Sequence, residues 1–175
     1  MTKKTKVKQS PFRLNVGFIV NQSIGYSREF VFELPEVHLP PDLDLNRLTG
    51  SARVSRTPQG LLVQVKMHAT VTVACVRCLE EVQQDLQIDF TELYAFSTRT
   101  STDSGLILPD DFHIDLGPLI REYMLLEIPI SPLCKPDCKG LCPVCGENLN
   151  ETQCDHHPET GDPRLAILKK LLDEE

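Results

Sequence analysis

The stretch LLVQVKMHATVTVAC, residues 61–75, decides the fold class because apolar and polar residues alternate along it. Side chains of a strand point in turn to its two faces, so this period of two predicts a long β-strand with one buried face. His68 belongs to the polar set, and we expect it at the surface rather than in a metal site. The apolar set is Val63, Val65, Met67, Ala69, Val71 and Val73, and the polar set is Gln64, Lys66, His68, Thr70 and Thr72.

Similar patterns flank this strand on both sides. Before it, residues 47–57 lead into a Pro58-Gln59-Gly60 turn, and after it the chain reverses through CVRCLEE, residues 75–81. Residues 82–96 then alternate around Leu86, Ile88 and Phe90. The pattern predicts an antiparallel meander of three strands within residues 47–96.

The segments outside the meander are assigned from their own signals. Residues 12–34 contain two apolar stretches separated by Ser23 and Gly25, which predicts two strands, and the Pro-rich, acidic residues 35–45 predict a connecting loop. A helix over 115–127 is expected from the helical spacing of its apolar residues, with Asp115 as N-cap and Pro129 beyond its end.

A second helix is expected at the C-terminus, because Asp162 and Pro163 form a typical helix start. The fold class is therefore α+β: an antiparallel β-meander core with a packed helix, a cysteine-rich zinc-knuckle segment and a C-terminal helix. We expect a basic flexible tail at 1–11, a β-rich α+β domain at 12–130, and the zinc-knuckle segment with its packed helix at 131–175.

Seven cysteines, an odd number, indicate metal ligands better than a full set of disulfides. CPVC, residues 142–145, is followed by a glycine, as in a zinc knuckle. One site is expected from Cys142, Cys145, Cys154 and His156, with His157 as the alternative to His156. A second, four-thiolate site is expected from Cys75, Cys78, Cys134 and Cys138. Both would be closed, structural zinc sites.

Other assignments of the cysteines stay open on the sequence alone. A single zinc could take Cys134 or Cys138 with Cys142, Cys145 and Cys154, which leaves Cys75 and Cys78 as free thiols. A chain without metal is a third alternative. A redox role for the Cys75–Cys78 pair is disfavoured, because thioredoxin-like pairs begin a helix and this one lies at a hairpin turn.

The charge is unevenly distributed: the chain carries −7, but the part after residue 13 carries −12. This acidic body suits a basic partner protein better than phosphate. The basic residues before it are either a solvated terminus or a contact for RNA; they are Lys3, Lys4, Lys6, Lys8 and Arg13. With no run of 18 apolar residues and no secretory signal, we expect a cytoplasmic protein.

Four segments together carry a family resemblance: CVRCLEE (75–81), IDLGPLIREYMLLEIPISPLC (114–134), CKGLCPVCGENLN (138–150) and DPRLAILKKL (162–171). In order and spacing the chain resembles the DUF177 family, also called the YceD family, over residues 10–172. Many members have a cysteine near the position of His156, and a histidine there keeps the ligand count.

The resemblance implies a role in accumulation of large-subunit ribosomal RNA, with no established enzymatic activity. The sequence agrees, since it has no phosphate-binding loop and no nucleophile motif. The expected function is a non-enzymatic factor in large ribosomal subunit biogenesis that binds a basic ribosomal protein or a precursor particle. The alternatives are a zinc protein that binds RNA directly and a thiol- or zinc-responsive regulator.

Overall fold

The computed structural model describes residues 10–97 and 104–156, which form two compact units. The first comprises the chain up to Val73 together with Val82–Pro132, and it contains the sheet and the helices. The second comprises Ala74–Glu81 and the chain from Leu133 onward, and it contains all seven cysteines. The tip of one hairpin thus belongs to the cysteine-rich unit.

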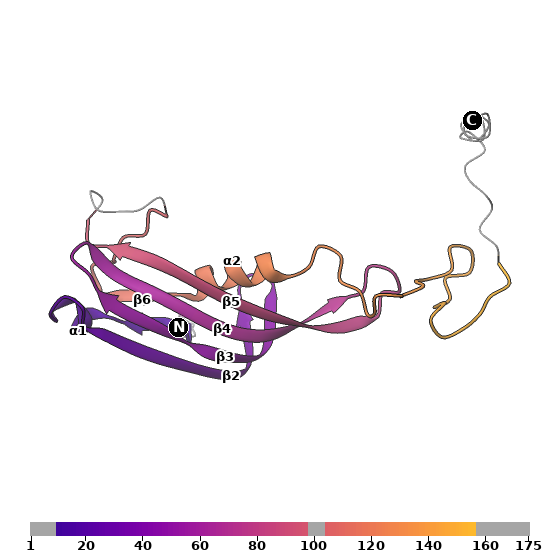
Figure 1. Cartoon of the computed structure of the whole chain (residues 1–175), viewed down its shortest axis with the longest axis horizontal. Helices are drawn as coiled ribbons and strands as arrows, with labels where there is room; N and C mark the ends of the chain where they lie inside the picture. The colour runs from indigo at the N-terminus through magenta and orange to yellow at the C-terminus, as the bar shows by residue number, and fades with distance from the viewer. Residues whose placement is uncertain (1–9, 98–103, 157–175) are drawn as a thin grey trace, which may run out of the picture. The chain divides into compact units, whose positions relative to one another are not determined.

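A four-stranded antiparallel sheet is the main element of the first unit (Figure 1). Its strands follow one another in chain order: β2 (Ser27–Leu39), β3 (Leu43–Arg56), β4 (Gly60–Ala74) and β5 (Glu81–Ala95). The predicted three-strand meander is confirmed as β3 to β5, and β2 extends it by one strand. The period of two in β4 is confirmed as well, since Val63 and Val65 are fully buried whereas His68 is exposed.

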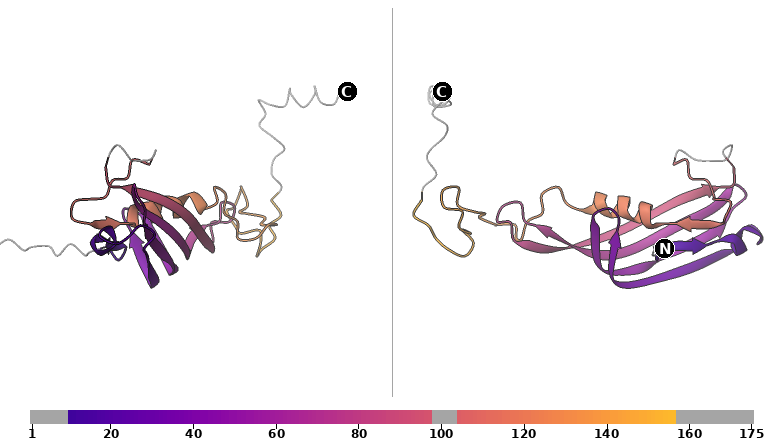
Figure 2. Two further views of the ribbon diagram at one scale, coloured as in Figure 1. Left: turned by 60° about the vertical axis from the view of Figure 1, so that its left-hand side comes forward. Right: turned by 180° about the vertical axis from the view of Figure 1, so that it is seen from behind.

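The β2–β3 hairpin is bent, and its end curls toward helix α2 (Figure 2). The bend coincides with an irregularity in β3, where the register with β4 shifts between Asn46 and Thr49 and Arg47 has a φ of 50°. Bulges of this kind bend a strand and increase its twist. At the hairpin end Asp42 accepts a hydrogen bond from Arg121 of α2 at 2.5 Å.

Helix α2 (Gly117–Glu127) packs on one face of the sheet and closes the core. Its Ile120 and Met124 are completely buried, and the Tyr123 ring stacks on Phe90 of β5 with centroids 4.1 Å apart. A two-stranded sheet of β1 (Arg13–Asn15) and β6 (His113–Asp115) adjoins this layer, with the short helix α1 (Gly17–Val20) after β1.

The first strand predicted within residues 12–34 is confirmed only in part, because β1 ends at Asn15 and α1 follows. The Asn15 side chain accepts the Gly17 N–H at 3.1 Å and turns the chain there. Val16 and Ile19 are fully buried at the start and within this short helix. The apolar residues of this stretch therefore reach the core from a helical backbone and not from a strand. The second predicted strand is confirmed as β2, which runs further than expected.

The predicted loop over 35–45 is also wrong: β2 continues to Leu39 and β3 begins at Leu43. Leu39 and Leu43 are buried, which holds both strands in the sheet up to the turn. Pro35 is tolerated because β2 is an edge strand.

The helix predicted after residue 115 is confirmed, but Leu116 rather than Asp115 is its N-cap. Asp115 ends β6 and still accepts the Gly117 N–H at 2.9 Å, so its carboxylate stabilises the helix start from one residue upstream. Thr70, predicted on the polar face, is buried instead, and its hydroxyl is satisfied by donating to the Asn46 carbonyl at the irregularity in β3.

Several predictions lie outside the described residues: the C-terminal helix, Lys3, Lys4, Lys6, Lys8 and His157. Among the residues that the structure describes, no helix has the length and apolar character needed to cross a membrane.

Candidate metal centres

The turn between β4 and β5, Cys75–Glu80, contains a C-x2-C pair and is termed the first knuckle. The Cys75 N–H donates to the Glu80 carbonyl at 2.8 Å, and the Leu79 N–H donates to the Cys75 carbonyl at 2.9 Å. These two bonds close the turn and direct both cysteine side chains to the same side. Leu79, just after the second cysteine, adopts a positive φ of 62°.

The segment Cys142–Glu147 forms the same turn a second time. The Cys142 N–H donates to the Glu147 carbonyl at 2.8 Å, and the Gly146 N–H donates to the Cys142 carbonyl at 2.9 Å. Gly146, with a φ of 77°, occupies the position that Leu79 has in the first knuckle. The two knuckles share the pattern C-x2-C-x-E, so one local geometry is used twice in this unit.

The first knuckle gathers a four-thiolate cluster. The sulfurs of Cys75, Cys78, Cys134 and Cys138 all lie within 4.8 Å of one another. The Sγ atoms of Cys75 and Cys138 are 3.9 Å apart, and those of Cys78 and Cys134 are 3.5 Å apart. A tetrahedral metal with bonds of about 2.3 Å to sulfur separates its ligands by about 3.8 Å, so the cluster has the size that such an ion requires.

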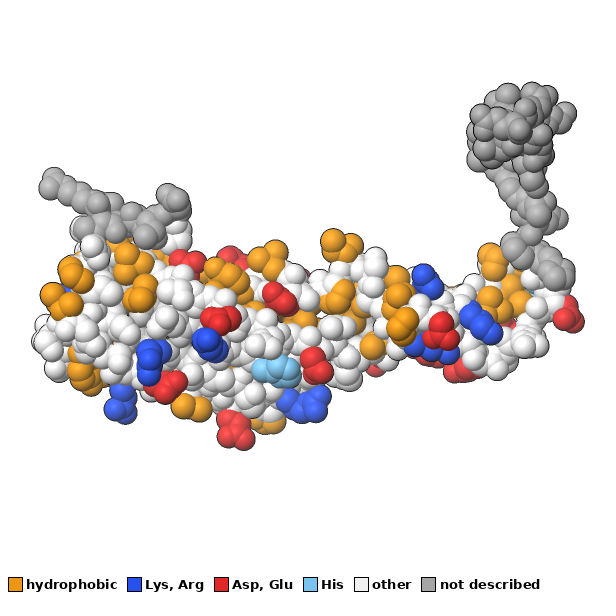
Figure 3. Space-filling view, in the orientation of Figure 1, with side chains coloured by type: hydrophobic (Ala, Val, Ile, Leu, Met, Phe, Trp, Pro, Cys, Tyr) orange, Lys and Arg blue, Asp and Glu red, His pale blue; other side chains and the backbone are white. Residues whose placement is uncertain are grey.

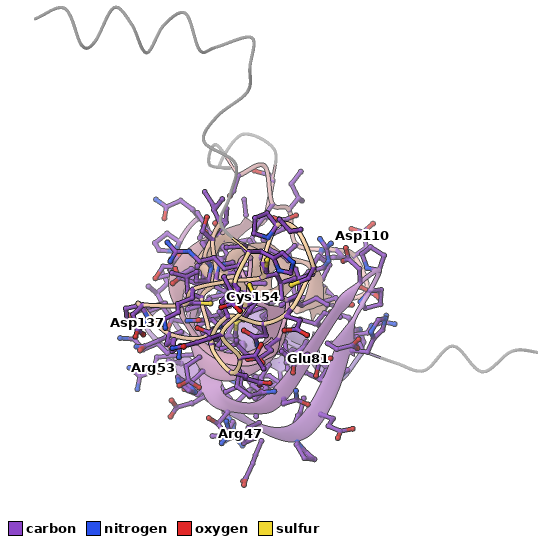
Figure 4. The ribbon with its side chains drawn as sticks, turned by 90° about the vertical axis from the view of Figure 1, so that its right-hand side faces the viewer. Arg47, Arg53, Glu81, Asp110, Asp137 and Cys154 are labelled. Carbon is purple, nitrogen blue, oxygen red and sulfur yellow. The ribbon has the colours of Figure 1, made fainter. Side chains whose placement is uncertain are left out.

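The second knuckle gathers a cluster of mixed ligands. Ligand atoms of Cys142, Cys145, Cys154 and His156 lie within 4.8 Å of one another. Cys142 is buried, but Cys145 and His156 are exposed. Figure 4 shows Cys154 among the loops of this unit, while the side chain of Asp137 points outward. The structure thus brings together the eight residues that the sequence predicted, in the same two groups of four.

Backbone amides favour the thiolate of the first cysteine in each knuckle. The pKa of Cys75 is lowered to about 6, mainly by the backbone N–H of Cys78 and against the effect of burial. The pKa of Cys142 is lowered to about 6 by the backbone N–H groups of Cys145 and Val144. In each knuckle the backbone therefore favours the charged form of the first cysteine.

Burial acts in the opposite sense on Cys134, raising its pKa to about 12, with the neighbouring sulfurs adding to the rise. Four thiolates crowded together repel one another, and only a cation in their centre allows all of them to lose their protons. Both clusters therefore could hold a metal ion, and the donor set of thiolates and imidazole fits a soft or borderline one.

Two asparagines that sequence reasoning did not single out lie after the second knuckle and donate hydrogen bonds to the four-thiolate cluster and its knuckle. Asn150 donates from Nδ2 to Cys138 Sγ at 3.3 Å, and Asn148 donates from Nδ2 to Glu80 at 2.6 Å. A second link joins the knuckles through Arg77, whose carbonyl accepts the Leu141 N–H and whose guanidinium donates to the Cys138 carbonyl. The signal in the sequence was the Asn-Leu-Asn that follows the second knuckle.

Arg13 is the one predicted RNA contact that the structure describes, and it already has an acidic partner. Its guanidinium donates to Asp111 at 2.9 Å. The pKa of Asp111 is lowered, first by the backbone N–H of His113 and also by Arg13. Binding of a phosphate by Arg13 would compete with this ion pair.

Comparison with known proteins gives a consistent result. A family model described as large ribosomal RNA subunit accumulation protein YceD matches residues 63–172. An uncharacterized protein of Mycobacterium tuberculosis is 37% identical over 137 residues, which cover 75% of this chain and 61% of the relative. The chain thus spans less than two thirds of the length of the first relatives.

Two further relatives broaden the range of organisms. The uncharacterized protein YlbN of Bacillus subtilis is 33% identical over 115 residues, covering 62% of this chain and 67% of that protein. An Arabidopsis thaliana protein named large ribosomal RNA subunit accumulation protein YCED homolog 1, chloroplastic, is 38% identical over 66 residues, or 38% of this chain and 21% of that protein. No solved structure matches the chain.

Proposed function

Because the chain belongs to the YceD family of large ribosomal RNA subunit accumulation proteins, we propose that it is a non-enzymatic factor in biogenesis of the large ribosomal subunit. The family match, which extends from β4 through both cysteine clusters, is the observation that carries this proposal. In this role the protein supports accumulation of large-subunit rRNA in the cytoplasm.

The partner in this proposal is a basic large-subunit ribosomal protein or a precursor particle that presents one. The chain after residue 13 carries a charge of −12, which attracts a basic protein and repels bare phosphate. On the face that Figure 3 displays, basic side chains are interspersed with acidic ones rather than gathered in a single stripe. Such a surface suits protein recognition better than tracking of a nucleic-acid backbone.

The metal in this proposal is Zn²⁺, with a structural role in both clusters. Cys75, Cys78, Cys134 and Cys138 would hold one ion, and the remaining three cysteines with His156 would hold the other. Four protein ligands at each ion leave no position for a reacting water, which distinguishes structural from catalytic zinc. The ions would fix the second unit, where few of the residues that the structure describes are apolar and buried.

The proposal is tested by affinity purification of the tagged full chain from its own cells at low and moderate salt. We expect large-subunit ribosomal proteins and precursor rRNA to be recovered, more at low salt, because charge complementarity contributes to binding. Cells lacking the protein should show a lowered ratio of large- to small-subunit rRNA. Failure to recover large-subunit components at either salt, with an unchanged rRNA ratio, contradicts the proposal.

Direct RNA binding is the second candidate, and the basic residues at 3–8 favour it. Ribonuclease treatment of the purified complexes separates the two. Recovery of ribosomal proteins that survives ribonuclease supports the protein partner. Recovery that is lost with ribonuclease and also on removal of residues 1–9 supports RNA binding through the basic segment.

A thiol-responsive regulator, the third candidate, requires accessible cysteines in the first knuckle. Cys75 is completely buried and Cys78 is 5% exposed, which supports a structural role for both. Rapid labelling of these two thiols in the native, metal-loaded protein would favour the regulator instead.

A further inference from the structure

Two asparagines of the segment after the second knuckle form a continuous chain of side-chain hydrogen bonds with the four-thiolate cluster. Glu80, in the first knuckle, accepts from Asn148 Nδ2 at 2.6 Å. Asn148 Oδ1 in turn accepts from Asn150 Nδ2 at 2.8 Å, and the same Asn150 amide group reaches Cys138 Sγ at 3.3 Å. Asn148 and Asn150 thus form an amide relay that contacts the four-thiolate cluster at Glu80 and at the sulfur of Cys138.

The relay does not belong to the segments that supply the four thiolates. It follows the second knuckle directly, and the segment is paired back on itself by a bridge between Leu141 and Asn148. The Asn148 carbonyl also accepts the Glu151 and Thr152 N–H groups, which forms a turn two residues before Cys154. Ligands of the mixed cluster therefore bracket the relay, with Cys142 and Cys145 before it and Cys154 and His156 after it.

The orientation of Asn150 is fixed on both sides of its amide. Its Oδ1 accepts the Lys139 N–H at 3.0 Å, so the Nδ2 group must face the sulfur of Cys138. A donor held against a metal-bound thiolate stabilises its charge and orients it, as outer-shell groups do in many metal sites. If the segment were not held in place, the Asn150 side chain could rotate, and its amide would no longer stabilise the Cys138 thiolate.

We propose that the amide relay of Asn148 and Asn150 couples the two metal sites, so that an ion in the mixed cluster strengthens metal binding by the four-thiolate cluster. An ion held by Cys142, Cys145, Cys154 and His156 fixes both ends of the segment that carries the relay. Because linkage is reciprocal, an ion in the four-thiolate cluster strengthens the mixed site by the same factor. This inference rests on the metal binding proposed above.

Cobalt titration of the full chain, with a competing chelator, tests the coupling. Co²⁺ bound by four thiolates and Co²⁺ bound by three thiolates and an imidazole absorb differently, so the two sites can be followed separately. We expect Cys142→Ser with Cys145→Ser, which removes the mixed site, to weaken the four-thiolate site by about 10- to 100-fold, the usual effect of losing outer-shell partners.

A double-mutant cycle assigns the coupling to the relay. Asn150→Ala in the intact chain should weaken the four-thiolate site by a similar factor, and it should add little when the mixed site is already removed. Asn150→Asp, which keeps the acceptor for Lys139 and loses the donor, should weaken it at least as much. Asn21→Asp, an exposed asparagine of the first unit, is the matched control and should change neither site.

The outcomes separate this inference from the proposed metal binding. If wild-type protein shows no thiolate–cobalt absorption, the metal proposal and the coupling both fail. If both sites fill but the four-thiolate affinity is the same with and without the mixed site, only the coupling is overturned. Full additivity of Asn150→Ala with removal of the mixed site also overturns it, since the relay would then act on one site alone.

Discussion

At the scale of single residues, the position after the second cysteine of each knuckle requires an unusual backbone conformation. Both Leu79 and Gly146 have a positive φ, a conformation that glycine adopts freely and other residues avoid. Leu79 is 64% exposed, so little burial compensates for its backbone conformation. The first knuckle therefore forms against the preference of one of its own residues.

Replacement of this residue should improve the first site. Leu79→Gly removes about 1–2 kcal/mol of backbone strain, partly offset by the greater flexibility of unfolded glycine, so we expect roughly fivefold tighter metal binding in chelator competition. The reverse change, Gly146→Leu, should weaken the mixed site by a similar factor. The space around Gly146 is open, so the effect comes from the backbone alone. Weaker binding by Leu79→Gly would show that the leucine side chain has a stabilising contact after all.

At the scale of elements, the two sides of α2 have different roles. Ile120 is completely buried against the sheet, whereas Leu126, on the same helix, is 79% exposed. Both are large aliphatic residues in a helix of 11 residues, so their comparison separates packing from helix propensity.

We expect Ile120→Ala to lower the free energy of unfolding of the first unit by about 2–5 kcal/mol, because it leaves a cavity in the core. Leu126→Ala should change it by less than about 0.5 kcal/mol. Denaturant unfolding followed by the far-UV signal of the sheet measures both. Equal effects of the two substitutions would contradict the packing of α2 described above.

At the scale of the whole molecule, the two units obtain their stability from different sources. The first has a continuous apolar core that contains none of the metal ligands, since all seven cysteines belong to the second unit. Among the described residues of the second unit, few are buried besides its cysteines. We infer that metal is needed for folding of the second unit and not for folding of the first.

Chelation should therefore remove two metal ions per chain and unfold one unit only. The expected result is loss of amide protection in residues 133–156, while the strands of the sheet keep their hydrogen-exchange protection and circular dichroism signal. Elemental analysis of the purified protein gives the stoichiometry. One ion per chain, or unfolding of the sheet on chelation, contradicts the two-site description.

The meander, the helix over 115–127 and the pattern of both knuckles could be predicted because each depends on neighbours in the sequence. Strand alternation at Val63 and Val65 and the paired cysteines of each knuckle are local signals, read over a few residues. The errors fell where a contact from elsewhere decided the backbone. Leu39 and Leu43 are held in strands by burial against the core, and Val16, just after β1, donates its N–H to the distant Phe112 carbonyl.

The sequence by itself therefore determined the antiparallel sheet, the number of candidate ligands and the family. Only the tertiary structure decided between the alternative groupings of the cysteines, by bringing Cys134 and Cys138 beside Cys75 and Cys78. It also revealed that Asn148 and Asn150 hydrogen-bond to Glu80 and Cys138. The physical reason is distance along the chain: 56 residues separate Cys78 from Cys134, and no local pattern encodes which segments meet across such a span. Those contacts are set by how the whole chain packs, and they bring the ligands of each cluster within reach of a single ion.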